Sequence, residues 1–449
     1  MRIPRTPPNM AEMMKSLEIE RVTELLIEAG VGQFVNSDYV HYEKLRFLEP
    51  PNGLSTDEWW LAIKFARMGG RKSLTDLRPV AGSSFSYLIP DPALELLHRI
   101  DTQASGSAAM PEAVANASTR DRYLFNSLLE EAITSSQLEG AATTRQQAKD
   151  MIRSGRAPRD RHEQMILNNF NAMLFARSVA DAPLTPEIVF EVHRIITDKT
   201  LDDEAAAGRL QGPADERVVV DDQDGQVLHT PPAADELPER LELMCAFANG
   251  ELDRDGYVHP VIRAIVLHFW LAYDHPFVDG NGRTARALFY WSMLKSGYWL
   301  VEYLSISRIL REAPVQYGTS FLQVATDEND LTYFIMYQLK VIDRALDEMH
   351  EYLAAKVAEI HEVESLVGAL DLNHRQLALL GRALRHPGSR YTYRSHATTN
   401  RVSRQTSRTD LLELESLGLL RKRRAGREVS FLAVGDLPDA LRAVDGADQ

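Results

Sequence analysis

The chain has 449 residues, a length that suggests two to four folding units, and its 44% hydrophobic and 25% charged residues are typical of a globular protein. No apolar stretch is long enough to span a bilayer, the N-terminus lacks the apolar core of a signal peptide, and the single cysteine, Cys245, excludes an internal disulfide framework. The formal net charge of −14 argues against nucleic-acid binding over the whole surface. Since the single cysteine fits a reducing cytoplasm and the sequence shows no membrane span or signal peptide, we expect a cytoplasmic protein that does not bind membranes.

Helical periodicity dominates the sequence, and the predicted fold class is mainly α. In a first segment, residues 1–110, helices are expected over 17–30, 56–68 and 91–100. A run of small residues at 101–118 then predicts a domain boundary. We assign no chemistry to this N-terminal helical extension.

The second segment, residues 111–345, is a series of apolar-periodic helices interrupted once. Helices are expected over 121–138, 161–180, 186–198, 235–249, 258–273 and 283–296. Within residues 217–230, two valine-containing runs flank Asp224 and Gly225, a pattern that predicts a β-hairpin. Such a hairpin is not needed for the core of a helical domain.

The most informative stretch is the loop 275–286, His-Pro-Phe-Val-Asp-Gly-Asn-Gly-Arg-Thr-Ala-Arg, between two of these helices. Gly280 and Gly282 permit a close approach to the backbone, and N–H groups just before a helix N-terminus form an anion cradle. Arg283 and Arg286 lie on neighbouring positions of the first helical turn. Two guanidinium groups at such a cradle suit a polyphosphate better than a lone carboxylate.

Three other side chains of this loop suggest further roles. Asp279 is poorly explained as a phosphate contact and is expected to hold Mg²⁺, which would bridge the phosphates. His275 precedes the cradle, where an imidazole can accept a proton from an attacking hydroxyl near neutral pH. Phe277 is expected to anchor the loop in the core.

The loop matches the motif HPFx(D/E)GNGRxxR of the Fic family at every specified position, and the resemblance covers most of the second segment. It implies the all-helical Fic core, with His275 as general base, Asp279 as Mg²⁺ ligand and Arg286 as the group that holds the γ-phosphate. The resemblance places nucleotide binding on Gly280, Asn281, Gly282, Arg283, Thr284, Ala285 and Arg286, of which the first four form the nest for the α- and β-phosphates.

The resemblance also implies a reaction, the transfer of AMP from ATP to a Tyr, Thr or Ser hydroxyl of a protein target or of the chain itself. Attack on the α-phosphate would be in line, with Mg²⁺ and the nest stabilising the developing charge. The family includes kinases and phosphocholine transferases, whose loops usually depart from the GNGR pattern that is intact here. The loop contacts phosphates rather than the base, so transfer of another nucleotide, such as UMP, stays open.

A second match lies upstream, at the end of a helix expected over about 121–140. Ser135, Glu139 and Gly140 resemble the family's inhibitory motif (S/T)xxxE(G/N), and the first two share one helix face. Gly140 suits a left-handed helix end. By this resemblance Glu139 forms a bidentate pair with Arg286 and holds ATP in an unproductive pose; in some relatives the same glutamate helps to remove AMP.

The resemblance gives the predicted hairpin a role, because Fic proteins use a β-hairpin flap to align the target backbone by strand addition. The flap residues are Val218, Val219, Val220, Val227, Leu228 and His229. Tyr317 is a candidate for contact with the adenine, although a tyrosine of the core explains it equally well.

The third segment follows a long amphipathic helix expected over roughly 331–365, and a connecting helix is assigned to residues 346–370. Residues 371–437 resemble a winged helix-turn-helix, with helices over 372–387 and 402–420 and a β-wing over 421–434. Basic residues are concentrated here, against the overall sign of the chain. Candidate DNA contacts are Arg404, Gln405, Thr406 and Arg408.

The competing hypothesis is a DNA-binding regulator whose Fic domain only senses nucleotide. Winged helices also bind proteins, and a basic run is often solvated surface. The sequence identifies neither the protein target nor the signal that releases Glu139, and it leaves a homo-oligomer open.

Overall fold

The computed structural model describes residues 1–449 apart from 28–31, 37, 52, 106–116, 222–223, 253–255, 368–371, 387, 426–427 and 446–449. The predicted mainly α fold is confirmed, since the strands are few and short. Most of the small-residue boundary expected at 101–118 lies outside the described residues. None of the helices in the described part of the chain has the length and apolarity needed to cross a membrane.

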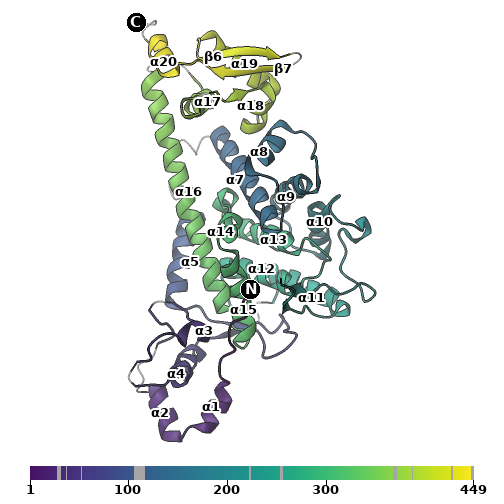
Figure 1. Ribbon diagram of the computed structural model, residues 1–449, viewed down its shortest axis with the longest axis vertical. Coiled ribbons are helices and arrows are strands. Elements are labelled where there is room, and N and C mark those ends of the chain that lie inside the picture. Colours follow the sequence, from purple (N-terminus) through teal and green to yellow (C-terminus); the bar gives the residue numbers. More distant parts are fainter. Residues whose placement is uncertain are drawn as a thin grey trace.

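The N-terminal part consists of short helices and one small two-stranded sheet, and its first four helices lie at the lower end of the molecule in Figure 1. Its elements are α1 (Met10–Ser16), α2 (Ile19–Ile27), α3 (Tyr42–Leu45), α4 (Thr56–Met68), β1 (Lys72–Ser73), β2 (Ser86–Tyr87) and α5 (Asp91–Ala104). A separate apolar cluster that includes Trp59 and Trp60 forms its core. The buried ion pair between Lys64 and Asp327, 2.8 Å, joins this part to the rest of the chain.

The central part is built from helices that share one hydrophobic core with α5. Its helices are α7 (Ala117–Leu138), α8 (Arg145–Ser154), α9 (Arg161–Ser178), α10 (Pro186–Thr197), η1 (Glu204–Ala206), η2 (Ala234–Glu236), α11 (Leu237–Ala248), α12 (Pro260–Asp274), α13 (Asn281–Lys295), η4 (Trp299–Tyr303), α14 (Ile306–Glu312) and α15 (Pro314–Thr326). The helices α12 and α13 pack against each other at the centre.

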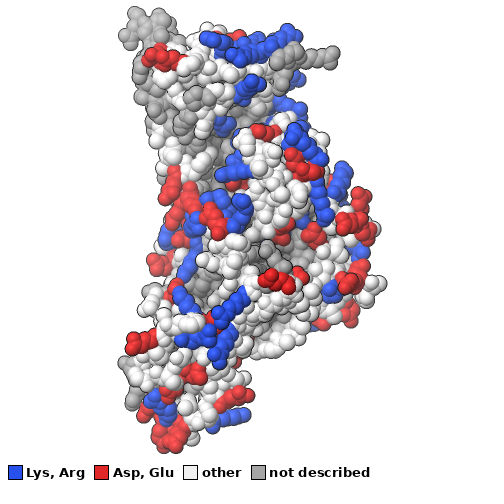
Figure 2. Space-filling view, viewed as in Figure 1, with Lys and Arg blue, Asp and Glu red and all other residues white. Residues whose placement is uncertain are grey.

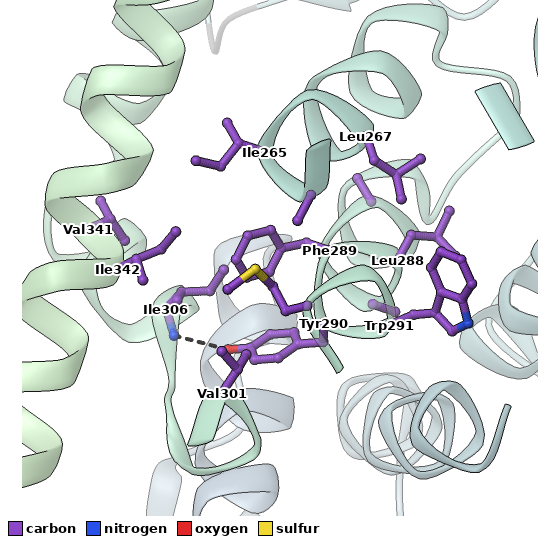
Figure 3. Close-up of a cluster of buried hydrophobic side chains, with 14 of the residues drawn as sticks. Ile265, Leu267, Leu288, Phe289, Tyr290, Trp291, Val301, Ile306, Val341 and Ile342 are labelled. Carbon is purple, nitrogen blue, oxygen red and sulfur yellow. Dashed lines mark hydrogen bonds between the residues drawn. The ribbon is translucent and has the colours of Figure 1, made fainter. Parts of the chain in front are cut away.

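Both central helices are buried along most of their length, which fixes the loop between them. Figure 3 shows side chains of α12, α13, α14 and α16 (Thr332–Val367) meeting in one cluster, in which the Tyr290 hydroxyl accepts a hydrogen bond from the Ile306 N–H. A loop between two such helices has little freedom to move, and we expect it to be preorganised.

The predicted hairpin is present but shorter than expected. Its strands are β3 (Val220–Asp221) and β4 (Val227–His229), paired antiparallel with a register irregularity. Val218 and Val219 precede the first strand, and part of the tip lies outside the described residues.

The helix α16 runs from the central part to a C-terminal module at the opposite end from the N-terminal helices (Figure 1). The module contains α17 (His374–Arg385), β5 (Arg390–Tyr391), α18 (Tyr393–Asn400), α19 (Arg404–Ser416), β6 (Leu420–Ala425), β7 (Glu428–Ala433) and α20 (Leu437–Asp445). The three strands form one sheet in the order β5-β7-β6, and the module has its own apolar core. Several helices were not predicted, namely α1, α3, α8, α14, α15, α18 and α20.

Candidate active site

The loop begins where α12 ends. His275 adopts the left-handed conformation, with φ 44 and ψ 54, and its N–H donates to Leu271 O over 2.9 Å. Left-handed backbone is uncommon for a residue with a side chain and requires support from its surroundings. Burial lowers the pKa of His275 to about 4, so the imidazole is neutral at pH 7 and able to accept a proton.

Arg217 provides this support. Its guanidinium donates to the carbonyl oxygens of Asp274 and His275, the latter over 2.7 Å, and its Nε donates to Pro232 O over 2.8 Å. One side chain thereby ties the loop start to the chain that follows the hairpin. Burial lowers the pKa of Arg217, and no carboxylate among the described residues forms a salt bridge with it, so it acts as a hydrogen-bond donor to the backbone.

Asn281 clamps the loop from its other end. Its side-chain oxygen accepts from the Phe277 N–H over 2.9 Å, and its side-chain nitrogen donates to Phe277 O over 2.7 Å. The Phe277 ring is buried, as predicted for an anchor. The amide side chain of Asn281 is therefore occupied within the loop.

His193 of α10 lies beneath the loop. Its ring stacks on Phe277 with centroids 3.8 Å apart and an interplanar angle of 7°. Its Nδ1 accepts from the Gly208 N–H over 2.9 Å, which places the proton on Nε2, and Nε2 donates to Asp279 O over 2.9 Å. Burial lowers the pKa of His193 to about 4, which keeps the ring neutral.

The N-terminus of α13 has no side-chain cap. Its N-cap residue is Gly280, with φ 82, and a Cβ added there would lie 3.0 Å from Thr197 Cγ2. Glycine is thus required by both backbone conformation and space. Because the first N–H groups of a helix lack intrahelical partners, an uncapped N-terminus offers donors and a positive dipole to an anion.

Acidic and basic side chains flank this N-terminus. Asp279 is about half exposed, at 46%, and its carboxylate lies 3.3 Å from Arg283 Nη2. Arg283 is buried, and its Nε has no hydrogen-bond partner in the described structure. Thr284 and Ala285, predicted with the nucleotide-binding residues, are fully buried, and the Thr284 hydroxyl donates to Gly280 O over 2.9 Å. Their side chains therefore face the core.

The structure brings Ser135 and Glu139 of the α7 end to Arg286. Arg286 Nη2 donates to Glu139 Oε1 over 2.8 Å, and Nε donates to Ser135 Oγ over 2.8 Å. The expected bidentate carboxylate pair is not formed, because Ser135 takes the Nε donor and its carbonyl accepts a further bond from Nη2. Gly140 follows with φ 91, as predicted for a left-handed helix end.

Glu139 also lies over the N-terminus of α13. A Cβ added to Gly282 would lie 2.2 Å from Glu139 Oε1 and 3.1 Å from Arg286 Nη1. Nη1 is buried and without a hydrogen-bond partner in the described structure. The carboxylate and an unused guanidinium donor therefore meet at the uncapped end of α13, where an incoming phosphate would lie.

Tyr317 of α15 lies close to this arginine. Its hydroxyl is 2.9 Å from Nε2 of His268, a fully buried residue of α12 whose pKa burial lowers to about 3. The charge of Arg286 acts on the Tyr317 hydroxyl, although burial dominates and raises the pKa of that group. The ring packs against the core and is partly exposed, and contact with the adenine stays a prediction.

The hairpin is fastened beside the loop. His229 Nε2 is 2.6 Å from Tyr273 O, two residues before His275, and the two rings are 4.5 Å apart. Val219 and Val227 are 40% and 49% exposed, which is unusual for valines and leaves them available to a partner.

The remaining predicted residues lie far along the chain on α19. Arg404, Gln405 and Arg408 are exposed, whereas Thr406 is partly buried and its N–H is bound by the N-cap oxygen of Ser403 over 3.0 Å.

Comparison with known proteins supports the identification of the domain. Residues 183–293 match the Fic/DOC family. The protein adenylyltransferase Fic of Nematostella vectensis is 27% identical over 273 residues, which cover 58% of this chain and 56% of that protein. The protein adenylyltransferase Fic of Culex quinquefasciatus is 30% identical over 166 residues, 36% of this chain and 31% of that protein. The chain thus spans about half or less of the length of these relatives.

Among solved structures, a Fic family protein from Desulfovibrio desulfuricans G20 is similar, with 20% identity and a TM-score of 0.47 over 78% of this chain and 98% of the other. Fic-1 from C. elegans is similar over 57% of this chain and 71% of that one, with 22% identity and a TM-score of 0.44. Because residues 183–293 match the Fic/DOC family, the chain contains a Fic/DOC domain, and the loop 275–286 lies within it.

Proposed function

We propose that this protein is an auto-inhibited protein adenylyltransferase that transfers AMP from ATP to a hydroxyl of a protein and releases pyrophosphate. The observation that carries the proposal is the contact of Glu139 with Arg286 at the uncapped end of α13. The names of the relatives support the reaction class.

The residues present fit a Mg²⁺ ion. Mg²⁺ usually binds one or two carboxylates together with substrate phosphates and water. Asp279 offers a partly exposed carboxylate next to the cradle. Among the described residues there is no cluster of three or more acidic, His or Cys side chains that would hold a metal without the nucleotide, so we expect metal and ATP to bind together. When bound, the ion would neutralise phosphate charge.

The roles of the protein groups follow from their positions. The α13 N–H groups and Arg283 would bind the α- and β-phosphates, and Arg286 the γ-phosphate, once Glu139 has moved. His275 accepts the proton of the attacking hydroxyl through its neutral imidazole. Arg217 and His193 hold the loop backbone, and the flap strands beside Tyr273 would align the target backbone.

Glu139 would inhibit in two ways. It engages Arg286 and, being negatively charged, repels a phosphate from the same helix end. Loss of the carboxylate would leave Nη1 and Nη2 of the arginine directed at the γ-phosphate. Removal of AMP by the same residue remains part of this proposal as a reverse activity.

The test is labelling with α-labelled ATP and Mg²⁺, using wild type, Glu139→Gly and His275→Ala, with exposed His162→Ala as a matched control. We expect stronger label on Glu139→Gly than on wild type. The control His162→Ala should carry as much label as wild type. We expect none on His275→Ala in the Glu139→Gly background. Equal labelling of wild type and Glu139→Gly would contradict auto-inhibition, and label on the His275→Ala double variant would contradict the assigned base. α-Labelled UTP distinguishes the other donor.

A second candidate function concerns the C-terminal module. We propose that residues 371–437 form a winged helix-turn-helix, joined by the connecting segment 346–370 to a catalytic unit at 111–345 and the N-terminal extension 1–110. The exposed Arg404, Gln405 and Arg408 and the exposed basic strand β6 favour DNA contact. A gel shift that persists in His275→Ala would support this role, and the absence of a shift at low salt would exclude it.

A further inference from the structure

A large cavity lies away from the loop, between α8 of the Fic/DOC-containing core and the C-terminal module. It has a volume of about 1270 Å³. One wall is formed by α8, and the other by α17, β5 and α18 with the start of α19. We call this cavity the interdomain groove.

The groove is strongly basic in a protein that is acidic overall. Eight lysine or arginine residues line it against one acidic residue, Asp150, whereas the whole chain carries a net charge of −14. Figure 2 shows Lys and Arg gathered over the C-terminal module and over the neighbouring face of the core. Basic side chains come from both walls, so the positive field is focused between them.

Several of these charges are not used by the fold. The side chains of Arg382, Arg390 and Arg404 have no salt-bridge or hydrogen-bond partner among the residues that the structure describes. By contrast, Lys149 on the α8 wall lies 3.1 Å from Glu130 at the edge of the groove. Burial lowers the pKa of Lys149, as expected for a cation that an anionic ligand would stabilise.

The two walls are held together by a defined contact. Arg394 Nη2 donates to Gly155 O at the end of α8 over 2.8 Å, and α18 packs against both α7 and α8. Gly155 is left-handed, with φ 62, and a Cβ there would lie 2.4 Å from Arg394 Nη2. The groove is therefore part of the fold and not an incidental gap.

We propose that the interdomain groove binds the phosphate backbone of a nucleic acid, with α8 of the core supplying one wall of the site. The volume far exceeds that needed for one phosphate. Basic side chains on both walls, with the unpaired arginines on the C-terminal wall, suit a repeated anion. This site differs from the outer face of α19 and from the wing, and it does not depend on the transferase activity.

Binding is measured by fluorescence anisotropy of a short fluorescein-labelled DNA duplex and of its single strand, with the full-length protein at low salt. We expect binding that weakens steeply as salt rises. The variants Lys149→Gln/Arg153→Gln on one wall and Arg382→Ala/Arg390→Ala on the other should each lower the affinity at least about tenfold. Each should also reduce the salt slope by about one for every phosphate that the variant no longer neutralises. Thermal unfolding confirms that each variant is folded.

Two control variants make the result specific. Lys15→Ala/Arg311→Ala removes the same charge from exposed positions outside the groove and should bind as wild type does. Arg408→Ala/Arg423→Ala tests the outer face of α19 and the wing. If only this last variant loses affinity, the groove proposal fails while the winged-helix proposal stands. Three outcomes would overturn the proposal. They are wild-type affinity in the α8-wall variant, absence of binding at low salt, and binding of a polyglutamate peptide in place of the oligonucleotides.

Discussion

Arg217 shows how much a single side chain outside the motif contributes to the loop. It donates to the backbone carbonyls of Asp274, His275 and Pro232 and pairs with no described carboxylate. Its role is to position His275, since it touches only the backbone of that residue. The resemblance to a family pattern did not reveal it, because Arg217 lies 58 positions before His275 in sequence.

Replacing Arg217 should therefore lower kcat more than it weakens nucleotide binding. In the Glu139→Gly background, Arg217→Ala is expected to lower kcat about 10- to 100-fold with little change in the KM for ATP, because the α13 cradle is untouched. Steady-state labelling measures both constants. Arg311→Ala is the exposed control, and a rise in KM with unchanged kcat would contradict a positioning role.

The pH dependence of the rate follows from the low pKa of His275. With a pKa of about 4, the imidazole stays unprotonated from pH 8 down to about 5. The rate of Glu139→Gly should be flat over that window and fall only as the pH approaches the pKa. Removal of Glu139 takes away a charge that raises this pKa, which shifts the fall to still lower pH. Initial rates in overlapping buffers test this, and a fall centred near pH 6.5 would contradict it.

At the scale of elements, α7 is held by more contacts than the one that Glu139 makes with Arg286. Glu131 is buried two helical turns before Glu139, and its carboxylate accepts from the Ser307 N–H over 3.1 Å and from both the Ser305 and Ser307 hydroxyls. Burial raises the pKa of Glu131. This contact fixes α7 against the start of α14, and with it the position at which Glu139 is presented.

Loss of the Glu131 contacts should weaken the contact between Glu139 and Arg286. Glu131→Ala leaves the Ser307 donors unsatisfied and is expected to lower the free energy of unfolding by about 2 to 4 kcal/mol. If the fold survives, labelling activity should rise. Urea unfolding and the labelling assay measure the two effects. Exposed Glu20→Ala should change stability by less than about 0.5 kcal/mol, and a destabilised Glu131→Ala without any rise in activity would show that Glu139 is placed by other contacts.

The elements missed in the sequence share a physical cause. The helices α8 and α18 are short and rich in polar residues, so each offers few apolar residues to a periodicity argument. Both are stabilised by packing against each other and by capping boxes at Thr144 and Thr392. The loop 275–286 could be predicted because its chemistry is contiguous. His193 and Glu131 could not, since their partners lie 86 and 176 residues away.

At the scale of the whole molecule, buried histidines make stability depend on pH. Burial lowers the pKa of His41, His193 and His275 to about 4 and that of His268 to about 3. Between pH 6.5 and 4 the unfolded chain binds protons that the folded chain does not. The free energy of unfolding should therefore fall as the pH falls through this window, by up to about 1.4 kcal/mol per pH unit for each histidine.

Thermal unfolding between pH 7.5 and 4.5 checks this sign. His193→Gln should be less stable than wild type at pH 7.5 but show a shallower loss on acidification, because one titrating group is gone. The exposed His162→Ala should keep the wild-type slope. Stability that rises on acidification from pH 6.5 to 5 would contradict the prediction.

The helix α16 has a consequence for how the ends of the molecule communicate. It is 36 residues long, about 54 Å at the usual helical rise, and it begins beside Tyr317 and ends at the C-terminal module. A flexible tether of equal length would let the module diffuse through a large volume, and each encounter with α8 would cost loop-closure entropy. A continuous helix such as α16 avoids that entropic cost, because it holds the module next to α8 before any ligand binds. The effective concentration of one groove wall at the other is therefore high and constant, and a ligand that spans both walls meets a site already assembled.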